Sequence, residues 1–271
     1  MTFEGAMSAS SPLNIAVLAG GYSGEADVSR RSAAMVMAHM DPNRYQAYLV
    51  HIERDGWWAE DPASGERIAV DKDTLGYISP KGQAIQADLA FVMVHGTPGE
   101  DGLLQAHLDL SGIPHTTANA RVMATTFHKG WTTTLLRNAG IPVAQSVECT
   151  PNETWNAERI DEVVAQLGLP CFVKPNESGS SIGISRVAER DELWPAIEGA
   201  RTTGTSTVLI EALLLGREFT CGVIPDGHGG VQALPVTEII SQNAFFDYAA
   251  KYDGQSREVT PAALNERDTS A

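Results

Sequence analysis

The sequence predicts a two-part α/β protein, with an open, mainly parallel sheet layer at the N-terminus and a second half of α+β architecture. Two observations carry this prediction. Apolar runs alternate with helical patterns up to about residue 120, which is the order that a parallel sheet requires. Later runs are separated by short turns, as in antiparallel pairs, so a boundary is expected near residues 118–126.

Three apolar runs define the predicted parallel layer. The predicted strands cover 14–19, 45–52 and 88–95, and the predicted helices cover 27–40 and 103–110. The third run is apolar at nearly every position, as in strands that are covered on both faces. A polar stretch over 60–82 is read as a small hairpin or loop insertion. Because ligands of such sheets bind beyond the carboxyl ends of the strands, a site is expected at the loops that begin at Gly20 and His95.

The second half begins with a pattern typical of a helix over 126–138, in which Phe127, Trp131 and Leu135 share one face. An amphipathic helix follows over 160–167. The remaining predicted elements are a hairpin around residues 171–187, a helix over 192–201, and strands over 207–211, 218–224 and 231–238.

Composition excludes several classes of protein. The formal net charge of −15 argues against nucleic acid as a partner, because phosphate backbones need clustered Lys and Arg. The N-terminus does not resemble a signal peptide, and no apolar run is long enough to span a membrane. Three widely spaced cysteines favour a reducing cytoplasm over a disulfide or zinc scaffold, and Cys171 and Cys221 are expected to be small buried hydrophobes.

A small polar loop follows the apolar run that ends at Lys174. Gly179 and Gly183 allow the backbone to approach a ligand closely, and Ser180 and Ser181 add hydroxyl donors. Backbone N–H groups of such a loop suit phosphate oxygens, with the lysine as a point cation beside them. The order of residues is neither a Walker A loop nor a dinucleotide fingerprint. From this segment alone, two interpretations remain open: a loop that binds phosphate and an ordinary hairpin turn.

Four segments then occur in one order. They are Gly20-Gly-Tyr-Ser-Gly-Glu25-Ala-Asp-Val-Ser29, His95-Gly-Thr-Pro-Gly-Glu100-Asp101-Gly102, Lys174-Pro-Asn-Glu-Ser-Gly-Ser-Ser181-Ile-Gly183 and Phe246-Asp-Tyr248-Ala-Ala-Lys251-Tyr252. Together they closely resemble the D-alanine–D-alanine ligases of the ATP-grasp superfamily, from about residue 14 onward. The resemblance implies an N-terminal tail over 1–13, an α/β substrate domain over 14–120, a central ATP-grasp subdomain over 121–206, and a partial C-terminal subdomain with a lid loop over 207–271.

The resemblance implies an activity. Two D-alanines are joined to D-alanyl-D-alanine through an acyl phosphate, for peptidoglycan synthesis in the cytoplasm. ATP and Mg²⁺ (or Mn²⁺) are the implied cofactors, D-alanine and ATP the implied partners, and a homodimer the implied assembly. Catalysis of this kind consists mostly of positioning and of neutralising phosphoryl charge.

The resemblance also implies residue roles in substrate binding and catalysis. Glu25 would hold the ammonium of the first D-alanine, with Ser29 and His95 as further substrate-binding residues. The implied catalytic residues are Glu25, Ser180, Lys251 and Tyr252, and in the closed state Ser180 would bond Glu25 and Tyr252. From the residues alone, the favoured interpretation of Glu25 is a solvated loop acid, and His95 is also interpretable as a strand-end residue satisfied by loop backbone.

A further set of residues is implied for ATP. The set is Lys129, Lys174, Ser180, Ser181, Glu211, Glu218 and Lys251. Lys129 on a predicted helix and Lys174 on a predicted strand would contact the phosphates. Glu211 would lie at the adenine pocket, and Glu218 would bind the ribose hydroxyls. From the residues alone, Lys129 is also readable as a solvated helix residue and Glu218 as an acid paired with Arg217.

The chain departs from the family pattern in three places. No metal ligands are assigned, because the family's acidic metal-binding strands are expected beyond Ala271; the last subdomain would be incomplete and the chain as given inactive. Ala212 and Phe246 replace a lysine and a tyrosine. The alternatives are a ligase with D-lactate or D-serine as second substrate, another ATP-grasp carboxylate–amine ligase, and a non-catalytic ATP-binding remnant.

Overall fold

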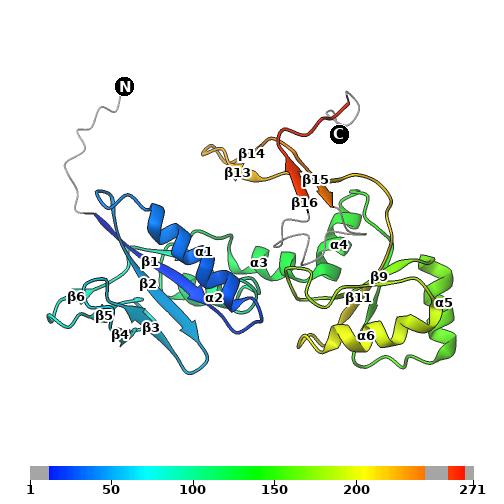
Figure 1. The fold of residues 1–271 in the computed structure, drawn as a ribbon, viewed down its shortest axis with the longest axis horizontal. Helices are drawn as coiled ribbons and strands as arrows, with labels where there is room; N and C mark the ends of the chain where they lie inside the picture. Colours follow the sequence, from blue (N-terminus) through cyan, green and yellow to red (C-terminus); the bar gives the residue numbers. More distant parts are fainter. Residues whose placement is uncertain (1–11, 242–255, 266–271) are drawn as a thin grey trace. The chain divides into compact units, whose positions relative to one another are not determined.

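The computed structural model describes residues 12–241 and 256–265. The chain divides into two compact units, Met1–Ile141 and Pro142–Ala271, each considered separately (Figure 1). The finer division at residues 120 and 206 stays a prediction. Among the described helices, none combines the length and the apolarity that crossing a bilayer requires.

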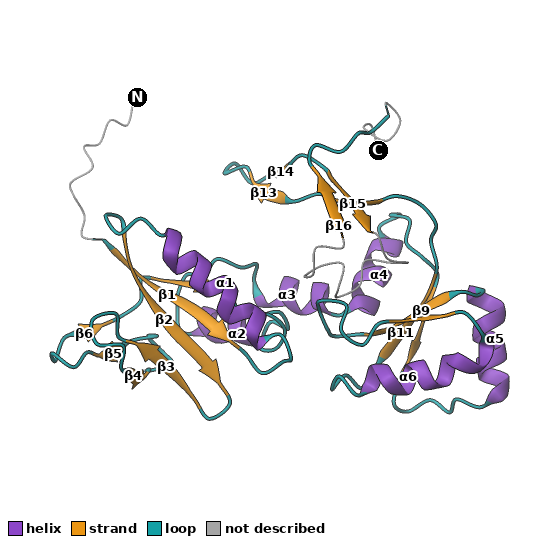
Figure 2. Ribbon diagram, viewed as in Figure 1, coloured by secondary structure: helices purple, strands orange, loops and turns teal. Residues whose placement is uncertain are grey.

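The first unit is built on a five-stranded sheet with the order β4-β3-β2-β1-β7. Figure 2 labels β1, β2, β3 and β4 of this sheet. Its strands are β1 (Leu13–Gly20), β2 (Tyr45–Glu53), β3 (Gly56–Glu60), β4 (Arg67–Ala69) and β7 (Leu89–Val92). β1 pairs in parallel with both β2 and β7, as predicted. The stretch predicted as a small hairpin or loop insertion contains the antiparallel strand β4 and the strand β5 (Tyr77–Ile78), which pairs with β6 (Ala84–Ile85) just after it.

Helices cover both faces of this sheet. Along β1, successive side chains point to opposite faces. Leu18 packs in the core that includes Leu104 and Leu108 of helix α2 (Leu103–Leu110). Val17 packs in the core that includes Ala33 of helix α1 (Ala26–His39). The central strand is therefore buried on both faces, which explains why its sequence is apolar at almost every position.

The predicted helix over 126–138 is confirmed from residue 129 onward as α4 (Lys129–Asn138), but residues 126 and 127 belong to a separate helix, α3 (Ala120–Phe127). His128 separates them in an extended conformation and caps α4, because its Nδ1 accepts a hydrogen bond from Trp131 N at 3.1 Å. Its ring also stacks on the Trp131 ring, with centroids 4.3 Å apart. Phe127 and Trp131 consequently lie on different helices, and Lys129 occupies the first position of α4.

The second unit contains a four-stranded antiparallel sheet with the order β10-β9-β11-β8, as its turn-rich sequence predicts. The strands are β8 (Ser146–Cys149), β9 (Cys171–Pro175), β10 (Ser185–Val187) and β11 (Val208–Ala212). Helices α5 (Ala157–Leu167) and α6 (Leu193–Arg201), the latter preceded by the 3₁₀ turn η1 (Arg190–Glu192), contribute Val163, Leu193 and Ile197 to its core.

The C-terminal strand region, residues 213–241 and 256–265, has five strands in two small sheets. They are β12 (Glu218–Thr220), β15 (Thr237–Ser241) and β16 (Ser256–Val259), and the pair β13 (Val223–Pro225) and β14 (Val231–Ala233). Each of the two strands predicted here is thus divided in two. Large apolar side chains are exposed throughout the region: Leu214, Leu215, Phe219, Val223, Ile224, Val231, Leu234 and Ile240.

One cysteine departs from expectation. Cys149 and Cys171 are buried, but Cys221 is exposed, so the prediction that it is a buried hydrophobe is wrong. It lies between β12 and β13, where neither neighbouring strand has a covered face. Its thiol donates to Leu234 O, with 3.2 Å between sulfur and oxygen.

Candidate functional site

The carboxyl ends of β1 and β7 meet in the first unit and bring two predicted loops together. Tyr22 N donates to Thr97 O at 2.8 Å. The Ser23 hydroxyl donates to His95 O at 3.1 Å and accepts from Glu25 N at 3.2 Å. This is the edge at which ligands of parallel sheets bind, so the two loops lie where the strand order predicts a site.

Glu25 is not a solvated loop acid. Only 4% of its surface is exposed. Its carboxylate lies against Gly96: a Cβ atom on that glycine would stand 3.2 Å from Glu25 Oε2 and 2.4 Å from Ser23 Oγ. Gly96 also has a φ of +65°, which disfavours any side chain. A buried carboxylate against bare backbone is suited to holding a small cation such as an ammonium group.

The loop His95–Gly102 has a fixed shape. Gly96 N donates to Glu100 Oε2 at 2.7 Å, and Glu100 N donates back to Gly96 O at 2.8 Å. A Cβ atom on Gly99 would stand 2.3 Å from Val94 O, so the loop admits only glycine there. Glu100 was given no role by the sequence, although its place four residues after Gly96 suits a hydrogen bond that closes the turn.

Ser29 lies behind these loops. It is fully buried, and its hydroxyl donates to Met93 O at 2.6 Å and accepts from Gly20 N at 2.9 Å. Both partners belong to the strand ends. This geometry supports a role in holding the loops better than direct contact with a substrate.

Lys174 and Glu211 form an ion pair in the second unit. They lie on β9 and β11, which are neighbouring antiparallel strands, and the ammonium contacts the carboxylate directly. Lys174 Nζ is also 5.6 Å from the centroid of the Phe172 ring. The ammonium is therefore oriented by a carboxylate and an aromatic face, and an incoming phosphate would compete with the carboxylate for it.

The loop between β9 and β10 has an unusual backbone. Ser180 and Ser181 have φ of 52° and 59°, in the left-handed region that few non-glycine residues adopt. Gly183 follows with a φ of +75°, and a Cβ atom there would stand 2.8 Å from Pro175 Cγ. Turns of this kind collect backbone N–H groups into a concave anion site. The residues present therefore fit the phosphates of a nucleotide.

The remaining predicted residues are placed as follows. Lys129 begins α4 and is half-buried, whereas Glu218 on β12 is exposed. Arg217 forms two hydrogen bonds of 2.7 Å with Glu238, and these bonds hold the pKa of Glu238 below its usual range. Lys251 and Tyr252 lie outside the described residues. Within 12–241 and 256–265, no group of three or more His, Cys, Asp or Glu gathers as a metal site would require.

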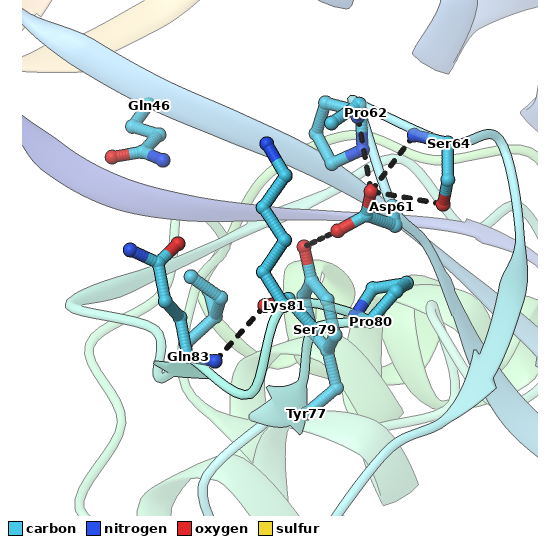
Figure 3. Close-up of a pocket in the computed structure, with 11 residues that line it drawn as sticks. Gln46, Asp61, Pro62, Ser64, Tyr77, Ser79, Pro80, Lys81 and Gln83 are labelled. Carbon is cyan, nitrogen blue, oxygen red and sulfur yellow. Dashed lines mark hydrogen bonds between the residues drawn. The ribbon is translucent and has the colours of Figure 1, made fainter.

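A cavity of about 240 Å³ lies apart from these loops, between the end of β3 and the β5–β6 pair (Figure 3). Asp61 accepts hydrogen bonds there from Ala63 N, Ser64 N and Ser64 Oγ, and Tyr77 OH reaches its other oxygen at 3.5 Å. The carboxylate thus stabilises the turn that begins β4, and no residue of the two strand-end loops lines this cavity.

Both halves of the chain match family models. Residues 14–118 match the model described as D-ala D-ala ligase N-terminus, and residues 135–271 match the model described as D-ala D-ala ligase C-terminus. The chain is 42% identical over 255 residues to the D-alanine–D-alanine ligase of Porphyromonas gingivalis, covering 94% of this chain and 76% of that relative. It is 41% identical over 252 residues to that of Phocaeicola vulgatus, covering 93% and 76%.

Solved structures agree with these matches. The D-alanyl-alanine synthetase A of Vibrio cholerae superimposes with a TM-score of 0.80 at 26% identity, covering 97% of this chain and 78% of that one. The VanG D-Ala:D-Ser ligase of Enterococcus faecalis gives 0.76 at 30% identity, covering 96% and 79%. A D-alanine–D-alanine ligase from Bacillus anthracis complexed with ATP gives 0.67 at 28% identity, covering 93% and 72%.

Proposed function

Because this chain belongs to the D-alanine–D-alanine ligase family, whose members are ATP-dependent ligases with ATP and Mg²⁺ as cofactors, we propose that it joins two D-alanines to D-alanyl-D-alanine for peptidoglycan synthesis. One D-alanine carboxylate takes the γ-phosphoryl group of ATP, and the amine of the second D-alanine then displaces phosphate. The observation that carries the proposal is the buried Glu25 carboxylate against Gly96, at the strand ends where a substrate is expected.

In the first unit, Glu25 binds the ammonium of the first D-alanine. A carboxylate that is already buried loses little further hydration when a cation arrives, so the interaction is stronger than at a solvated surface. His95, joined to this loop through Ser23, contacts the substrate carboxylates. These two contacts orient the carboxylate that is to be phosphorylated.

In the second unit, Lys174, Ser180 and Ser181 bind the phosphates of ATP. The role of Lys129 in phosphate binding is carried over from the family resemblance. Lys174 exchanges its Glu211 partner for a phosphate oxygen, which leaves Glu211 to accept a hydrogen bond from the nucleotide. Bound ATP supplies the phosphoryl group. The side chains position it and offset its charge.

Other roles are carried over from the family resemblance. Glu218 binds the ribose hydroxyls, and its exposed position on β12 leaves both carboxylate oxygens accessible. Lys251 and Tyr252 serve as part of a lid, and Ser180 also takes part in catalysis. The protein works in the cytoplasm and forms a homodimer through its first domain.

We also propose that the C-terminal strand region is part of a larger subdomain, and that residues 1–271 alone do not catalyse the formation of the dipeptide. The exposed apolar side chains of this region support the proposal, as does the length of the chain, which covers 76% of its Porphyromonas gingivalis relative.

The test measures dipeptide formation by mass spectrometry, with ATP, Mg²⁺ and D-alanine. Residues 1–271 and the same chain extended by the coding sequence that follows it are compared, with Glu25→Gln as the inactive control. Product from the extended chain alone supports both proposals. Product from 1–271 overturns the second, and product with D-serine or D-lactate but not D-alanine reassigns the second substrate. ATP binding without any product would indicate a non-catalytic protein.

A further inference from the structure

Two fully buried polar side chains hold the loop 93–102 from behind. Ser29 comes from helix α1 and Gln105 from helix α2, so the loop is fixed from both helix layers of the first unit. Buried polar side chains are uncommon in a core unless they complete a hydrogen-bond network. Gln105 attracts no notice in the sequence, because a glutamine on an amphipathic helix is normally a solvated residue.

Ser29 joins the two strand ends to each other. Its hydroxyl donates to Met93 O at 2.6 Å and accepts from Gly20 N at 2.9 Å. Gly20 leads into the loop that carries Glu25, and Met93 leads into the loop that carries His95. One hydroxyl therefore sets the spacing between the backbones from which both substrate-binding side chains extend.

Gln105 holds the middle of the second loop. Its Nε2 donates to Gly99 O at 2.7 Å and to Thr117 Oγ1 at 3.1 Å. The reverse orientation of the amide would set its oxygen against the Gly99 carbonyl, so the contact itself determines the orientation. In this orientation the buried Oε1 has no hydrogen-bond partner among the described residues. The side chain thus holds Gly99 although one of its own polar atoms is left unsatisfied, which costs free energy.

We propose that Ser29 and Gln105 are positioning residues for D-alanine, acting through the backbone of the loops and not through contact with the substrate. The inference rests on the proposed function and deepens it. With either bond lost, the loop 93–102 shifts relative to Glu25, and the Gly96 backbone no longer lies against that carboxylate. The hydrogen bonds of both side chains lie within the first unit, at the loops that carry Glu25 and His95, so the effect is expected on the amino-acid substrate.

The experiment compares Ser29→Ala and Gln105→Leu with Tyr48→Phe. All three variants are made in whichever of the two chains, residues 1–271 or the extended chain, forms the dipeptide. Tyr48 is the matched control, because its buried hydroxyl donates to Leu75 O at 2.7 Å in the same unit, away from both loops. Steady-state kinetics gives KM for D-alanine and for ATP, and thermal unfolding gives the stability of each variant. We expect KM for D-alanine to rise about tenfold in both loop variants while KM for ATP stays within about twofold. The control changes stability alone.

Several results would overturn the inference. They are an unchanged KM for D-alanine, an equal rise in KM for ATP, or the same kinetic change in Tyr48→Phe. If Gln105→Leu does not fold, Ser29→Ala decides alone, since it removes one oxygen and adds no atom. Absence of dipeptide from the wild-type protein would refute the proposed function, which is a different result from an active wild type with unaffected variants.

Discussion

Strand β1 of the first unit and the strands of the C-terminal strand region have apolar side chains in opposite surroundings. β1 is buried on both faces and leads into the strand-end loops, in which Glu25 N and the Ser29 hydroxyl are hydrogen-bonded. The strands β12 to β14 contain Phe219, Val223 and Val231, yet every position of these strands is exposed. A pattern of apolar residues therefore predicts a strand, but only tertiary structure decides whether its faces are covered.

The largest expected difference between these regions is in stability. Leu104→Ala removes a side chain from the core of the first unit and should lower the free energy of unfolding by about 2–5 kcal/mol. Leu215→Ala, at a side chain that is 90% exposed, should change it by less than about 0.5 kcal/mol. Urea unfolding followed by circular dichroism measures both. Equal losses would mean that the apolar surface of the C-terminal strand region is covered in solution.

Self-association should depend on the exposed strands. The double variant Val223→Thr, Val231→Thr keeps the β-branched shape of both side chains while making their surface more polar. We expect less association in concentration-dependent light scattering, with stability changed by less than about 0.5 kcal/mol. If the variant associates as strongly as the wild type, self-association does not depend on these two side chains.

Acid stability should differ between the two units. Burial alone would raise the pKa of Asp61, but hydrogen bonds from Ser64, Ala63 and Tyr77 outweigh it and lower the pKa. Since the folded-state pKa lies below the unfolded-state value, the stabilisation is complete above the unfolded pKa, about 4, and is lost as pH falls through the folded one. Asp61→Asn should therefore be less stable than the wild type at pH 7, with the difference closing toward pH 3.

The matched variant in the second unit is Asp161→Asn. The hydrogen bond from Arg190 lowers the pKa of Asp161, so the sign of the effect is the same. Because both side chains of this pair are exposed, the effect of Asp161→Asn on the melting temperature should be smaller. A melting temperature that responds more to Asp161→Asn than to Asp61→Asn, at neutral pH, would reverse this comparison.

The smallest expected effect is in thiol reactivity. Burial raises the pKa of the Cys149 thiol to about 11 and also raises that of Cys171, so both remain protonated and covered near neutral pH. The exposed Cys221 should react first with a thiol reagent, giving one rapid equivalent in the native protein and three in denaturant. Cys221→Ser should abolish the rapid phase. Fast labelling of Cys149 would indicate opening of the β8–β11 sheet.

Periodicity predicted most of the fold, and the strand order predicted that the loops of the candidate site lie together. The helix over 103–110 and the strands around β1 follow from apolar spacing alone. The division at His128 does not, because histidine is a weak signal for a helix cap. Ser29 and Gln105 were not recognisable as loop supports, since only the folded chain shows that both side chains are buried and hydrogen-bonded to the loop backbone. Cys221 was misplaced because an apolar run carries no information about which layers cover it.

The left-handed backbone at Ser180 and Ser181 has a consequence for the rate and strength of the nucleotide binding proposed for this loop. Two side chains in this region raise the energy of the free loop, so its shape is set before any ligand arrives. A pre-shaped loop loses less conformational entropy on binding, which favours rapid capture. Glycine at either position would relieve the strain, but it would also give the backbone of the loop more accessible conformations. Backbone strain in the free protein thus preorganises the loop for its ligand, and an unstrained sequence at these two positions would bind the nucleotide less well.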